Sequence, residues 1–368
     1  MSNNVDLYYV HLFNDFSGSP RVLRDAIDSE VNHPSNTFVF TSKHAGFLDN
    51  VNAQRVNCFY ARSRNRYIQL FYFLFSQVTL FGQLFCYLLI GLLKRRKSTV
   101  VINTMLPFGA GIASKLMGAN VIYYVHETYI KPELLKQFLR FFIEHCATRV
   151  IFVSQYLQSV ESFIKPDQNV IYNGLRSDFP VISSVDGNLK FNGKQLFFAG
   201  SLKLYKGLEQ LFELALLLPE FNVVAAINCE TEELNEFLHN RTIPDNVKVM
   251  ARPSNIQQYF ANSFAVLNLS LPDGWIETFG LSLIEGMAFG SPVVAPPIGG
   301  PVEFVDDRNG LLIDSRKTQK IADFIRYLNS SIDIWDAFSQ HAMLISQRFS
   351  SAEYKKSIKR YFKQHNLV

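Results

Sequence analysis

Two successive series of short apolar runs, each run followed by a segment with helical spacing, restrict the fold of this sequence more than any other feature. The runs of the first series lie at 5–13, 37–41, 99–103, 121–125, 149–153 and 169–172. Those of the second series lie at 195–199, 223–228, 247–250, 265–269 and 292–295. Strands that alternate with helices form parallel sheets whose two faces are both covered. The pattern therefore predicts an α/β protein with two Rossmann-like domains, each built on a parallel sheet.

A polar stretch that is rich in Ser, Asn, Gly and Pro, roughly 177–195, separates the two series and is typical of a domain linker. We predict an N-terminal domain, a linker and a C-terminal domain at 1–178, 179–194 and 195–349. Ser350 and Glu353 have capping-box spacing, so a last helix is expected at 350–368, packed back on the N-terminal domain. A ligand is expected in a cleft between the two halves, at the carboxyl ends of the strands.

The composition excludes several classes of protein. Hydrophobic residues make up 48% of the chain and charged residues 18%, which is a globular balance and not that of a disordered chain. The net charge of +4 is small, and Lys and Arg lack the concentration on one face that a nucleic-acid-binding domain usually has. The four cysteines show no CxxC spacing and indicate neither a zinc site nor a disulfide framework. The N-terminal residues lack the basic and apolar regions of a signal peptide, so we expect a cytoplasmic protein.

Residues 67–93 contain no charged side chain and are long enough to span a bilayer. Gln69, Ser76 and Gln83 recur every seven residues, on one face of a helix. A membrane-spanning helix would separate strands that must share one sheet, whereas a buried helix would pack on that sheet. A third possibility is a helix or helix pair that covers the sheet and presents aromatic surface to a lipid interface. We favour a mixture of the last two, because basic residues flank the segment: Arg62, Arg64, Arg66, Lys94, Arg95, Arg96 and Lys97.

A second basic stretch lies near the C-terminus and contains Lys355, Lys356, Lys359, Arg360 and Lys363. It is typical either of a solvated helix face or of a surface that is attracted to anionic lipid headgroups. Together with the apolar segment, it leads us to expect a protein that is peripherally associated with the inner leaflet of the cytoplasmic membrane.

The stretch 272–313 carries the most specific motif. Glu277 and Glu285 have seven residues between them, and Thr278, Phe279 and Gly280 form a turn that leads into helical spacing from Leu281. The unpaired backbone N–H groups at the start of a helix, with the helix dipole, suit phosphate oxygens. Carboxylates on either side of that phosphate site could bind sugar hydroxyls. Without further context, the same pattern also fits an ordinary strand, turn and helix with solvated glutamates.

The wider context resembles the signature of family-4 glycosyltransferases, the large retaining family with the GT-B fold that includes bacterial surface-polysaccharide enzymes. Thr278 in place of Gly and Gly286 in place of Ala are mild departures. The matching residues are Glu277, Phe279, Gly280, Leu281, Glu285, Met287, Ala288, Gly290, Pro292, Val293, Val294, Ala295, Gly299, Gly300, Glu303, Asn309 and Gly310.

The resemblance extends across most of the chain. Residues 198–207 are similar to a phosphate-binding loop of the family, in which Lys206 matches the lysine that contacts the donor diphosphate. Ser201 stands where many members have a second phosphate-contacting arginine, a role that Lys203 or Arg252 could take over. His126, after the run 121–125, matches an active-site histidine of the family. The first loop, which approaches the donor phosphates in the family, is represented by Gly18 and Ser19.

The family resemblance implies a role for each of these residues. The N-terminal domain binds the acceptor and the C-terminal domain binds the nucleotide sugar. Glu285 holds the ribose, Glu277 contacts the transferred hexose, and Lys206 with backbone N–H groups at Gly280 and Leu281 stabilises the leaving diphosphate. His126 contacts the donor sugar beside the reacting carbon. No metal and no cofactor beyond the nucleotide sugar is expected, and a UDP-sugar is preferred slightly over a GDP-sugar.

The expected reaction is therefore transfer of a hexosyl unit from a nucleotide sugar to a glycan acceptor, one that is lipid-linked and belongs to a surface polysaccharide. A dinucleotide-dependent dehydrogenase is not indicated, because neither half has GxGxxG after its first strand. A nucleotide-sugar epimerase or a phosphorylase with the GT-B fold stays open, since a fold alone does not settle a reaction. A noncatalytic nucleotide-sugar-binding subunit is the remaining alternative. The joint presence of His126, Lys206, Glu277 and Glu285 argues against it.

Overall fold

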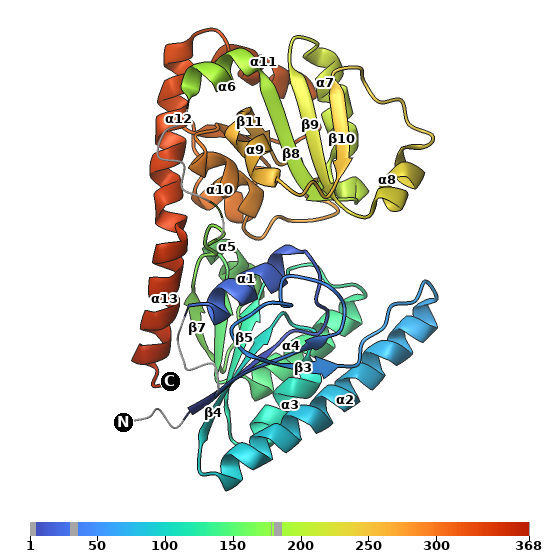
Figure 1. Cartoon of the computed structure of the whole chain (residues 1–368), viewed down its shortest axis with the longest axis vertical. Coiled ribbons are helices and arrows are strands. Elements are labelled where there is room, and N and C mark those ends of the chain that lie inside the picture. Colours follow the sequence, from blue (N-terminus) through green and yellow to red (C-terminus); the bar gives the residue numbers. More distant parts are fainter. Residues whose placement is uncertain (1–4, 30–35, 178, 180–185, 368) are drawn as a thin grey trace. The chain divides into compact units, whose positions relative to one another are not determined.

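The computed structural model describes residues 5–29, 36–177, 179 and 186–367. The chain forms two compact units, the first made of residues 1–174 and 351–368 and the second of residues 175–350. Each unit contains a parallel sheet with helices on its faces (Figure 1). The prediction of an α/β protein with two Rossmann-like parallel sheets is confirmed.

The first sheet has the order β3-β2-β1-β4-β5-β6-β7, with all neighbouring strands parallel. Its strands are β1 (Val5–Val10), β2 (Thr37–Ser42), β3 (Gln54–Cys58), β4 (Lys97–Asn103), β5 (Asn120–Val125), β6 (Arg149–Phe152) and β7 (Asp167–Val170). The chain proceeds from β1 toward β3 and then crosses to β4 on the other side of β1. In open parallel sheets, ligands bind at the carboxyl ends of the strands beside such a reversal. The ends of β1, β4 and β5 therefore mark the candidate site of this unit.

The second sheet has the order β10-β9-β8-β11-β12-β13 and is also parallel. Its strands are β8 (Gln195–Ser201), β9 (Asn222–Asn228), β10 (Val247–Ala251), β11 (Ser263–Leu267), β12 (Val293–Ala295) and β13 (Gly310–Leu312). The strand order reverses between β8 and β11, so the segments that follow these two strands are the candidate site of this unit.

A short helix lies where the sequence predicted a linker. The linker predicted at 179–194 contains a helix, α6 (Gly187–Gly193), while 180–185 lie outside the described residues. Asp186 begins this helix by accepting a hydrogen bond from the N–H of Leu189 at 3.0 Å. Lys190 is 1% exposed and donates to the carbonyl oxygen of Phe289 and to Ser291 Oγ. The ammonium group therefore ties α6 to the core of the second unit, which makes this part of the linker ordered structure.

Helices cover both sheets. In the first unit they are α1 (Gly18–Ile27), α2 (Arg66–Leu93), α3 (Phe108–Leu116), α4 (Glu133–Cys146), α5 (Gln155–Glu161) and α13 (Ser351–Gln364). In the second unit, besides α6, they are α7 (Leu208–Leu217), α8 (Thr231–Leu238), α9 (Ile256–Ala261), α10 (Leu281–Ala288), α11 (Thr318–Leu328) and α12 (Ile332–Ser346). Short 3₁₀ segments lie at Leu204–Lys206, Gly300–Glu303 and Gln347–Phe349.

The apolar segment predicted at 67–93 is a single helix, α2, whose first turn is capped by Asn65. Its buried face consists of Phe73, Ser76, Gln77, Leu80, Leu84, Leu88 and Gly91. The two polar residues of this face are satisfied internally, since Gln77 Oε1 accepts from the N–H of Gly109 in α3 and Ser76 donates to the carbonyl of Phe73. By length and composition α2 could cross a membrane, and one third of its most apolar window is buried. However, β3 before it and β4 after it belong to one sheet, which excludes a spanning helix.

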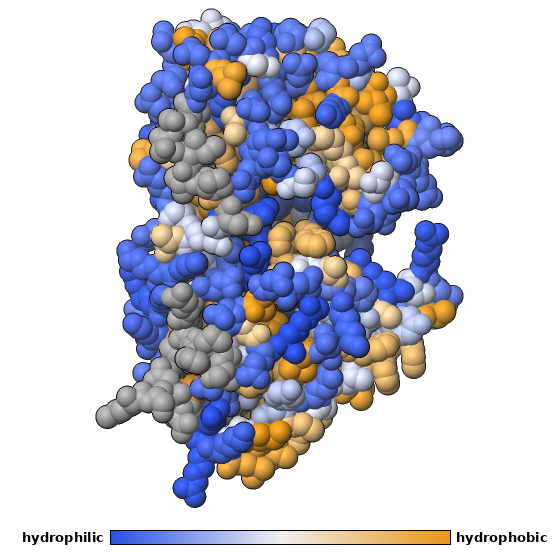
Figure 2. Space-filling view, in the orientation of Figure 1, coloured by the Kyte–Doolittle hydropathy of each residue, from blue (hydrophilic) through white to orange (hydrophobic). Residues whose placement is uncertain are grey.

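The opposite face of α2 is exposed and apolar. Its large exposed side chains are Tyr67, Ile68, Leu70, Phe71, Leu74, Phe75, Val78, Leu89, Ile90, Leu92 and Leu93. Hydrophobic surface accordingly gathers over α2 in the space-filling view (Figure 2). Most surface helices show the reverse arrangement, with polar residues toward solvent and an apolar stripe toward the core.

Candidate functional site

A carboxylate and a lysine meet at the carboxyl ends of β8 and β11 in the second unit. Lys206 Nζ lies 2.9 Å from Glu277 Oε2, and Asn268 Nδ2 donates to the same oxygen at 3.2 Å. Burial alone would raise the pKa of Glu277, but the charge of Lys206 and the hydrogen bonds from Lys206 and Asn268 lower it below its ordinary value. Glu277 is therefore held as a carboxylate.

Glycines bring the segments of this cluster close to one another. Gly207 follows Lys206 with φ 85°, and a Cβ there would lie 2.1 Å from the carbonyl oxygen of Leu269. Gly299 has φ 96°, and a Cβ there would lie 2.2 Å from the carbonyl oxygen of Glu277. The next N–H, that of Gly300, donates to this carbonyl at 2.8 Å. Side chains at these glycines would push Lys206 and Glu277 apart, so the loops that carry them depend on glycine.

Helix α10 begins directly after this cluster. Gly280 precedes its first residue with φ 102°, so the chain can turn into the helix without a side-chain clash. The N–H groups of Leu283 and Ile284 donate to the Gly280 carbonyl at 3.1 and 3.3 Å. The N–H groups that come first in a helix lack the partner four residues earlier and point outward from its N-terminus. Glu285, one turn further along α10, is 7% exposed, and Thr278 and Phe279 are also buried. The ring of Phe279 packs against Phe304 and Phe349, so this residue can reach a ligand only through its backbone.

Two aromatic residues that the sequence analysis missed lie beside the lysine. The rings of Tyr205 and Trp275 are stacked, with centroids 5.8 Å apart and planes inclined by 13°. Lys206 Nζ lies 5.3 Å from the centroid of Trp275. The indole thus flanks the ion pair on one side and provides an apolar wall for whatever binds there. No spacing rule would have found this pair, because 70 residues separate the two rings in the sequence.

The remaining residues predicted to contact the donor in this unit are Ser201 and Arg252. Ser201 ends β8, and its carbonyl accepts from the N–H of Lys203 at 2.8 Å. Arg252 follows β10, where its guanidinium group bonds to Asn228 Oδ1 and Glu230 Oε1 at 3.0 and 2.8 Å. The suggestion that Arg252 contacts a phosphate stays a prediction, and such a contact would have to compete with Glu230.

In the first unit, two histidines and an asparagine form a buried hydrogen-bonded row. Asn103 at the end of β4 lies between His11, which follows β1, and His126, which follows β5. Asn103 Oδ1 is 2.7 Å from His126 Nε2, and Asn103 Nδ2 is 3.0 Å from His11 Nδ1. Burial, and for His126 also the proximity of His11, lowers the pKa of His126 to about 3 and burial lowers that of His11 to about 4. Both rings are neutral at physiological pH.

The neighbouring residues of this row carry two further signs of a functional site. Burial raises the pKa of Glu127 to about 7, against hydrogen bonds that lower it, among them one from the Thr104 side chain. Thr104 has φ 76°, a left-handed conformation that is an outlier for a β-branched residue. Strained backbone of this kind clusters at binding and active sites. The sequence offered one signal for these residues, namely that each follows an apolar run at a strand end.

The first loop contributes backbone atoms to the same region. Gly18 is exposed at the start of α1, and the carbonyl oxygen of Ser19 accepts from Asn103 Nδ2 at 3.1 Å. Asp15 Oδ1, just before the helix, accepts from the N–H of Ser17 at 2.9 Å. Contact of Gly18 and Ser19 with donor phosphates stays a prediction.

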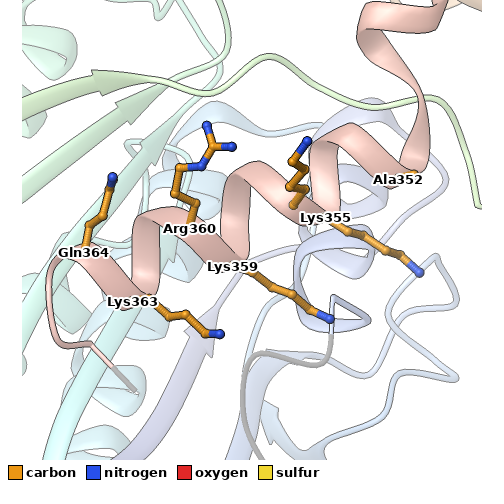
Figure 3. A pocket seen from close by; sticks show the side chains of 7 residues that line it. Ala352, Lys355, Lys359, Arg360, Lys363 and Gln364 are labelled. Carbon is orange, nitrogen blue, oxygen red and sulfur yellow. The ribbon is translucent and has the colours of Figure 1, made fainter.

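A shallow groove of about 490 Å³ runs along α13 and is lined by Ala352, Lys355, Lys356, Lys359, Arg360, Lys363 and Gln364. The basic side chains stand along one helix and extend outward, and Figure 3 shows Lys359 and Lys363 pointing to the same side. None of the residues named above as donor or sugar contacts lines this groove. It presents concentrated positive charge and no group that could carry out chemistry.

Comparisons with known proteins agree with this geometry. Residues 184–342, somewhat less than half of the chain, match the family described as glycosyl transferases group 1. Sucrose-phosphate synthase 4 of Arabidopsis thaliana is 39% identical over 80 residues, which are 22% of this chain and 8% of that relative. The chain therefore spans less than a tenth of the length of this curated relative.

Solved structures are similar over nearly the whole chain. HepE of Anabaena, in complex with UDP and glucose, superposes with a TM-score of 0.77 at 19% identity, over 97% of this chain and 99% of that one. WaaG, a glycosyltransferase involved in lipopolysaccharide biosynthesis, superposes with a TM-score of 0.71 at 12% identity, over 96% and 98%. The likeness shows that the two domains have the GT-B fold, and the match over 184–342 supports a glycosyltransferase of group 1.

Proposed function

We propose that this chain is a retaining, metal-independent glycosyltransferase of family 4, which transfers a hexosyl unit from a nucleotide sugar to a lipid-linked glycan of a surface polysaccharide. The observation that carries the proposal is the cluster of Lys206, Glu277 and Asn268 beside the N-terminus of α10. It combines a cation and the N-terminus of a helix, which suit a diphosphate, with a fixed carboxylate, which suits sugar hydroxyls. The similar fold of HepE in complex with UDP and glucose supports this class of donor.

The charged and the neutral residues have different roles in the proposed reaction. Lys206 and the first N–H groups of α10 stabilise the negative charge that develops on the diphosphate as the glycosidic bond breaks. Glu277 binds hydroxyls of the transferred hexose, and Glu285 binds the ribose. His126 contacts the donor sugar through a neutral ring. No protein nucleophile takes part: the acceptor attacks from the face that the diphosphate leaves, and the departing phosphate takes the acceptor proton. Lys206 takes the place that a divalent cation holds in metal-dependent transferases.

A thermal-shift panel tests the donor assignment. The protein is heated with UDP, GDP, their hexose derivatives and ATP as a control, each at a saturating concentration. A ligand present at about 100 times its Kd stabilises a protein by about 2.7 kcal/mol, enough to move the melting temperature measurably. We expect a UDP-hexose to give the largest shift, and a GDP-hexose instead would redirect the base assignment. If no nucleoside diphosphate or nucleotide sugar shifts the melting temperature, the proposed donor site is wrong.

Incubation with the stabilising donor separates a transferase from an epimerase. In the absence of acceptor, an epimerase converts the donor sugar, whereas a transferase leaves the donor intact apart from slow hydrolysis. Transfer to a lipid-linked glycan acceptor, with the anomeric configuration read by NMR, then tests retention. A donor that is bound but neither converted nor transferred to any acceptor would favour a noncatalytic binding subunit.

We also propose that the first unit binds the inner leaflet of the cytoplasmic membrane through the exposed face of α2. This face is apolar over the whole length of the helix, and its most exposed side chains include Tyr67, Phe71, Val78 and Leu93. Water contact with so many large apolar groups is unfavourable, at about 25 cal/mol per Å² of exposed apolar surface. A lipid interface removes that contact and also gives access to an acceptor that stays in the bilayer.

Charge favours a lipid surface over a protein partner. Arg62, Arg64 and Arg66 stand before or at the start of α2, and Lys94 and Arg95 follow its last turn. Each cation near an anionic membrane contributes about 1 kcal/mol. The exposed face thus has apolar residues in its middle and cations at both ends, which matches the acyl and headgroup layers of an anionic leaflet.

Vesicle sedimentation tests this surface with three variants, each of which carries three substitutions. Arg64→Gln with Arg66→Gln and Lys94→Gln should weaken binding to anionic vesicles and its salt dependence. Phe71→Ser with Val78→Ser and Leu93→Ser should remove the part of the binding that resists salt. Lys355→Gln with Lys359→Gln and Lys363→Gln, on α13, is the charge-matched control and should keep the salt-resistant part. The proposal fails if the wild-type protein ignores both anionic and neutral vesicles.

A further inference from the structure

Asn103 is placed where three separate segments of the first unit meet. It ends β4, the strand between β1 and β5, and its side chain is fully buried. It contacts the first loop at the carbonyl of Ser19, the end of β1 at His11, and the end of β5 at His126. The amide is thus engaged on both of its ends, and neither the sequence motif nor the family resemblance singled it out.

The orientation of the amide follows from these partners. The carbonyl oxygen of Ser19 can only accept a hydrogen bond, so the NH₂ group of Asn103 must face it, at 3.1 Å. The second hydrogen of the same NH₂ group is directed at His11 Nδ1, 3.0 Å away. Asn103 Oδ1 therefore faces His126 Nε2 at 2.7 Å and must accept a hydrogen bond from its N–H group. The Ser19 carbonyl, through Asn103, determines which nitrogen of His126 carries the hydrogen.

We infer that Asn103 is a positioning residue that holds His126 as the neutral tautomer with the hydrogen on Nε2, so that Nδ1 presents a lone pair to a hydroxyl group of the substrate. This inference rests on the proposed function for the identity of the substrate as a sugar. A hydroxyl that donates its hydrogen to Nδ1 has the lone pairs of its oxygen directed away from the ring. A ring of the other tautomer, or a charged ring, would offer an N–H at that position and repel such a donor.

The charged and titratable groups around the ring agree with a neutral acceptor. His11 faces His126 across Asn103, Glu127 Oε2 accepts from the backbone N–H of His126 at 3.3 Å, and Asp15 influences His11 from the first loop. The ring of Tyr124 lies against His126, with centroids 4.7 Å apart. Burial outweighs the attraction of Asp15 for a proton on His11, and it lowers the pKa of both histidines. Loss of activity with protonation of a histidine near pH 6.5 is therefore not expected in the wild type.

The test begins with a measurement that needs no transfer activity. The protein is labelled with ¹⁵N-histidine, and the His126 signals are assigned by their loss in His126→Gln. We expect the ring-nitrogen shifts of a neutral Nε2–H tautomer that persists from pH 8 to pH 5. A spectrum of the Nδ1–H tautomer, or of a ring that takes up a second proton near pH 6.5, would overturn the inference.

Substitutions in β4 then distinguish a positioning role of Asn103 from a contribution to stability alone. Asn103→Ala should lower kcat for transfer by about ten- to a hundredfold and leave the Kd for the free nucleoside diphosphate unchanged. Asn103→Asp should raise the pKa of His126, because a carboxylate favours the protonated ring, and should introduce a new acid limb in the pH profile. The matched control is Thr99→Val, which removes another buried hydrogen bond of β4, from Thr99 Oγ1 to the Leu367 carbonyl at 2.9 Å. It should leave the tautomer and the pH profile unaltered.

Failure of the inference differs from failure of the proposed function. A protein with the expected tautomer that transfers no sugar would refute the transferase and leave the role of Asn103 toward His126 in place. If Asn103→Ala and Thr99→Val lower kcat equally, or if Asn103→Ala retains the Nε2–H tautomer and full kcat, Asn103 is structural only. Should Asn103→Asp not fold, the wild-type spectrum and Asn103→Ala still decide between these outcomes.

Discussion

The candidate sites of the two units use opposite electrostatics. In the second unit, Lys206 keeps the partly buried carboxylate of Glu277 ionised, so the site consists of formal charges. In the first unit, burial drives His11, His126 and Glu127 toward their uncharged forms. A nucleotide sugar has the same division, with charge on its diphosphate and neutral hydroxyls on its sugar. The comparison indicates that one unit is suited to the leaving group and the other to uncharged hydroxyls.

The difference arises from what surrounds each carboxyl group. Glu277 has a cation at 2.9 Å and an amide donor at 3.2 Å. At Glu127, by contrast, burial raises the pKa, and hydrogen bonds from backbone groups and the Thr104 side chain oppose it. A nearby opposite charge outweighs desolvation, but hydrogen bonds to a buried group do so only in part. The pKa of a glutamate is therefore lowered in the second unit, at Glu277, and raised in the first unit, at Glu127.

The largest expected effect comes from removing the cation of the charged site. Lys206→Ala should lower kcat by about ten- to a thousandfold, the range for the loss of one electrostatic donor to a developing negative charge. Steady-state kinetics with saturating donor measures it. Lys320→Ala, a change of an exposed lysine on α11, is the control and should have little effect. Equal losses in the two variants, or near-normal activity of Lys206→Ala, would remove Lys206 from the site.

The raised pKa of Glu127 in the first unit leads to a prediction about stability. Because burial raises the pKa of Glu127 to about 7, the folded state holds this proton more tightly than the unfolded state does. Stability is therefore lost as pH rises from the ordinary value toward about 7, by about 3 kcal/mol in total. Glu127→Gln should raise the free energy of unfolding by about that amount at pH 8 and by little at pH 4.5, measured by urea denaturation. Glu133→Gln on the exposed surface of α4 should change neither, and a Glu127→Gln variant without pH dependence would contradict the assignment.

The two carboxylates of the second unit should separate in binding experiments. Glu285 holds the ribose in our proposal, so Glu285→Gln should weaken binding of free nucleoside diphosphate by about ten- to a hundredfold, as expected for a lost hydrogen bond to a charged group. In the same proposal Glu277 contacts only the hexose, so Glu277→Gln should bind the free nucleotide as the wild type does. Titration calorimetry with UDP and UDP-hexose measures both. Identical affinities of the two variants for free UDP would show these roles to be wrong.

The smallest expected effect is that of metal removal. In our proposal Lys206 and the backbone N–H groups of α10 supply the positive charge, so transfer should continue at an unchanged rate in EDTA. The assay compares initial rates with EDTA, without it, and after addition of magnesium or manganese. Complete loss in EDTA that either metal restores would break the comparison, because the charge of the second site would then come from an ion.

The sequence predicted most of the fold because buried parallel strands are continuous apolar runs. Eleven of the strands begin and end within a few residues of their predicted bounds, and α10 starts at Leu281 as expected. Strand β3 was missed because it is an edge strand of sequence QRVNC, whose residues are largely in contact with solvent. Strand β13 has three residues, too few for a periodicity, and α6 is a polar helix held by the buried Lys190.

Residues of the candidate sites could be predicted from the sequence only where they belong to a recognisable motif. Lys206 and Glu277 were expected as separate contacts, but their ion pair depends on loops 71 residues apart. His11 and Asn103 lie within the predicted runs 5–13 and 99–103, and the sequence contains no sign that they face one another. Asn268 and the stacked rings of Tyr205 and Trp275 were missed for the same reason. Such partners become visible only when the strand order is known.

The membership of α13 in the first unit has a consequence for how the protein is made. Tyr354, Ile358, Tyr361 and Phe362 of this helix are buried, and Thr99 of β4 bonds to the carbonyl of Leu367. The ribosome synthesises residues 5–174 long before these side chains exist, so the first sheet emerges with part of its cover missing. The second unit, by contrast, is contiguous in the chain and can finish folding as soon as it leaves the exit tunnel. We therefore expect the later half of the translated chain to be the first to complete its core, and a stalled nascent chain that lacks α13 to be a target for chaperones.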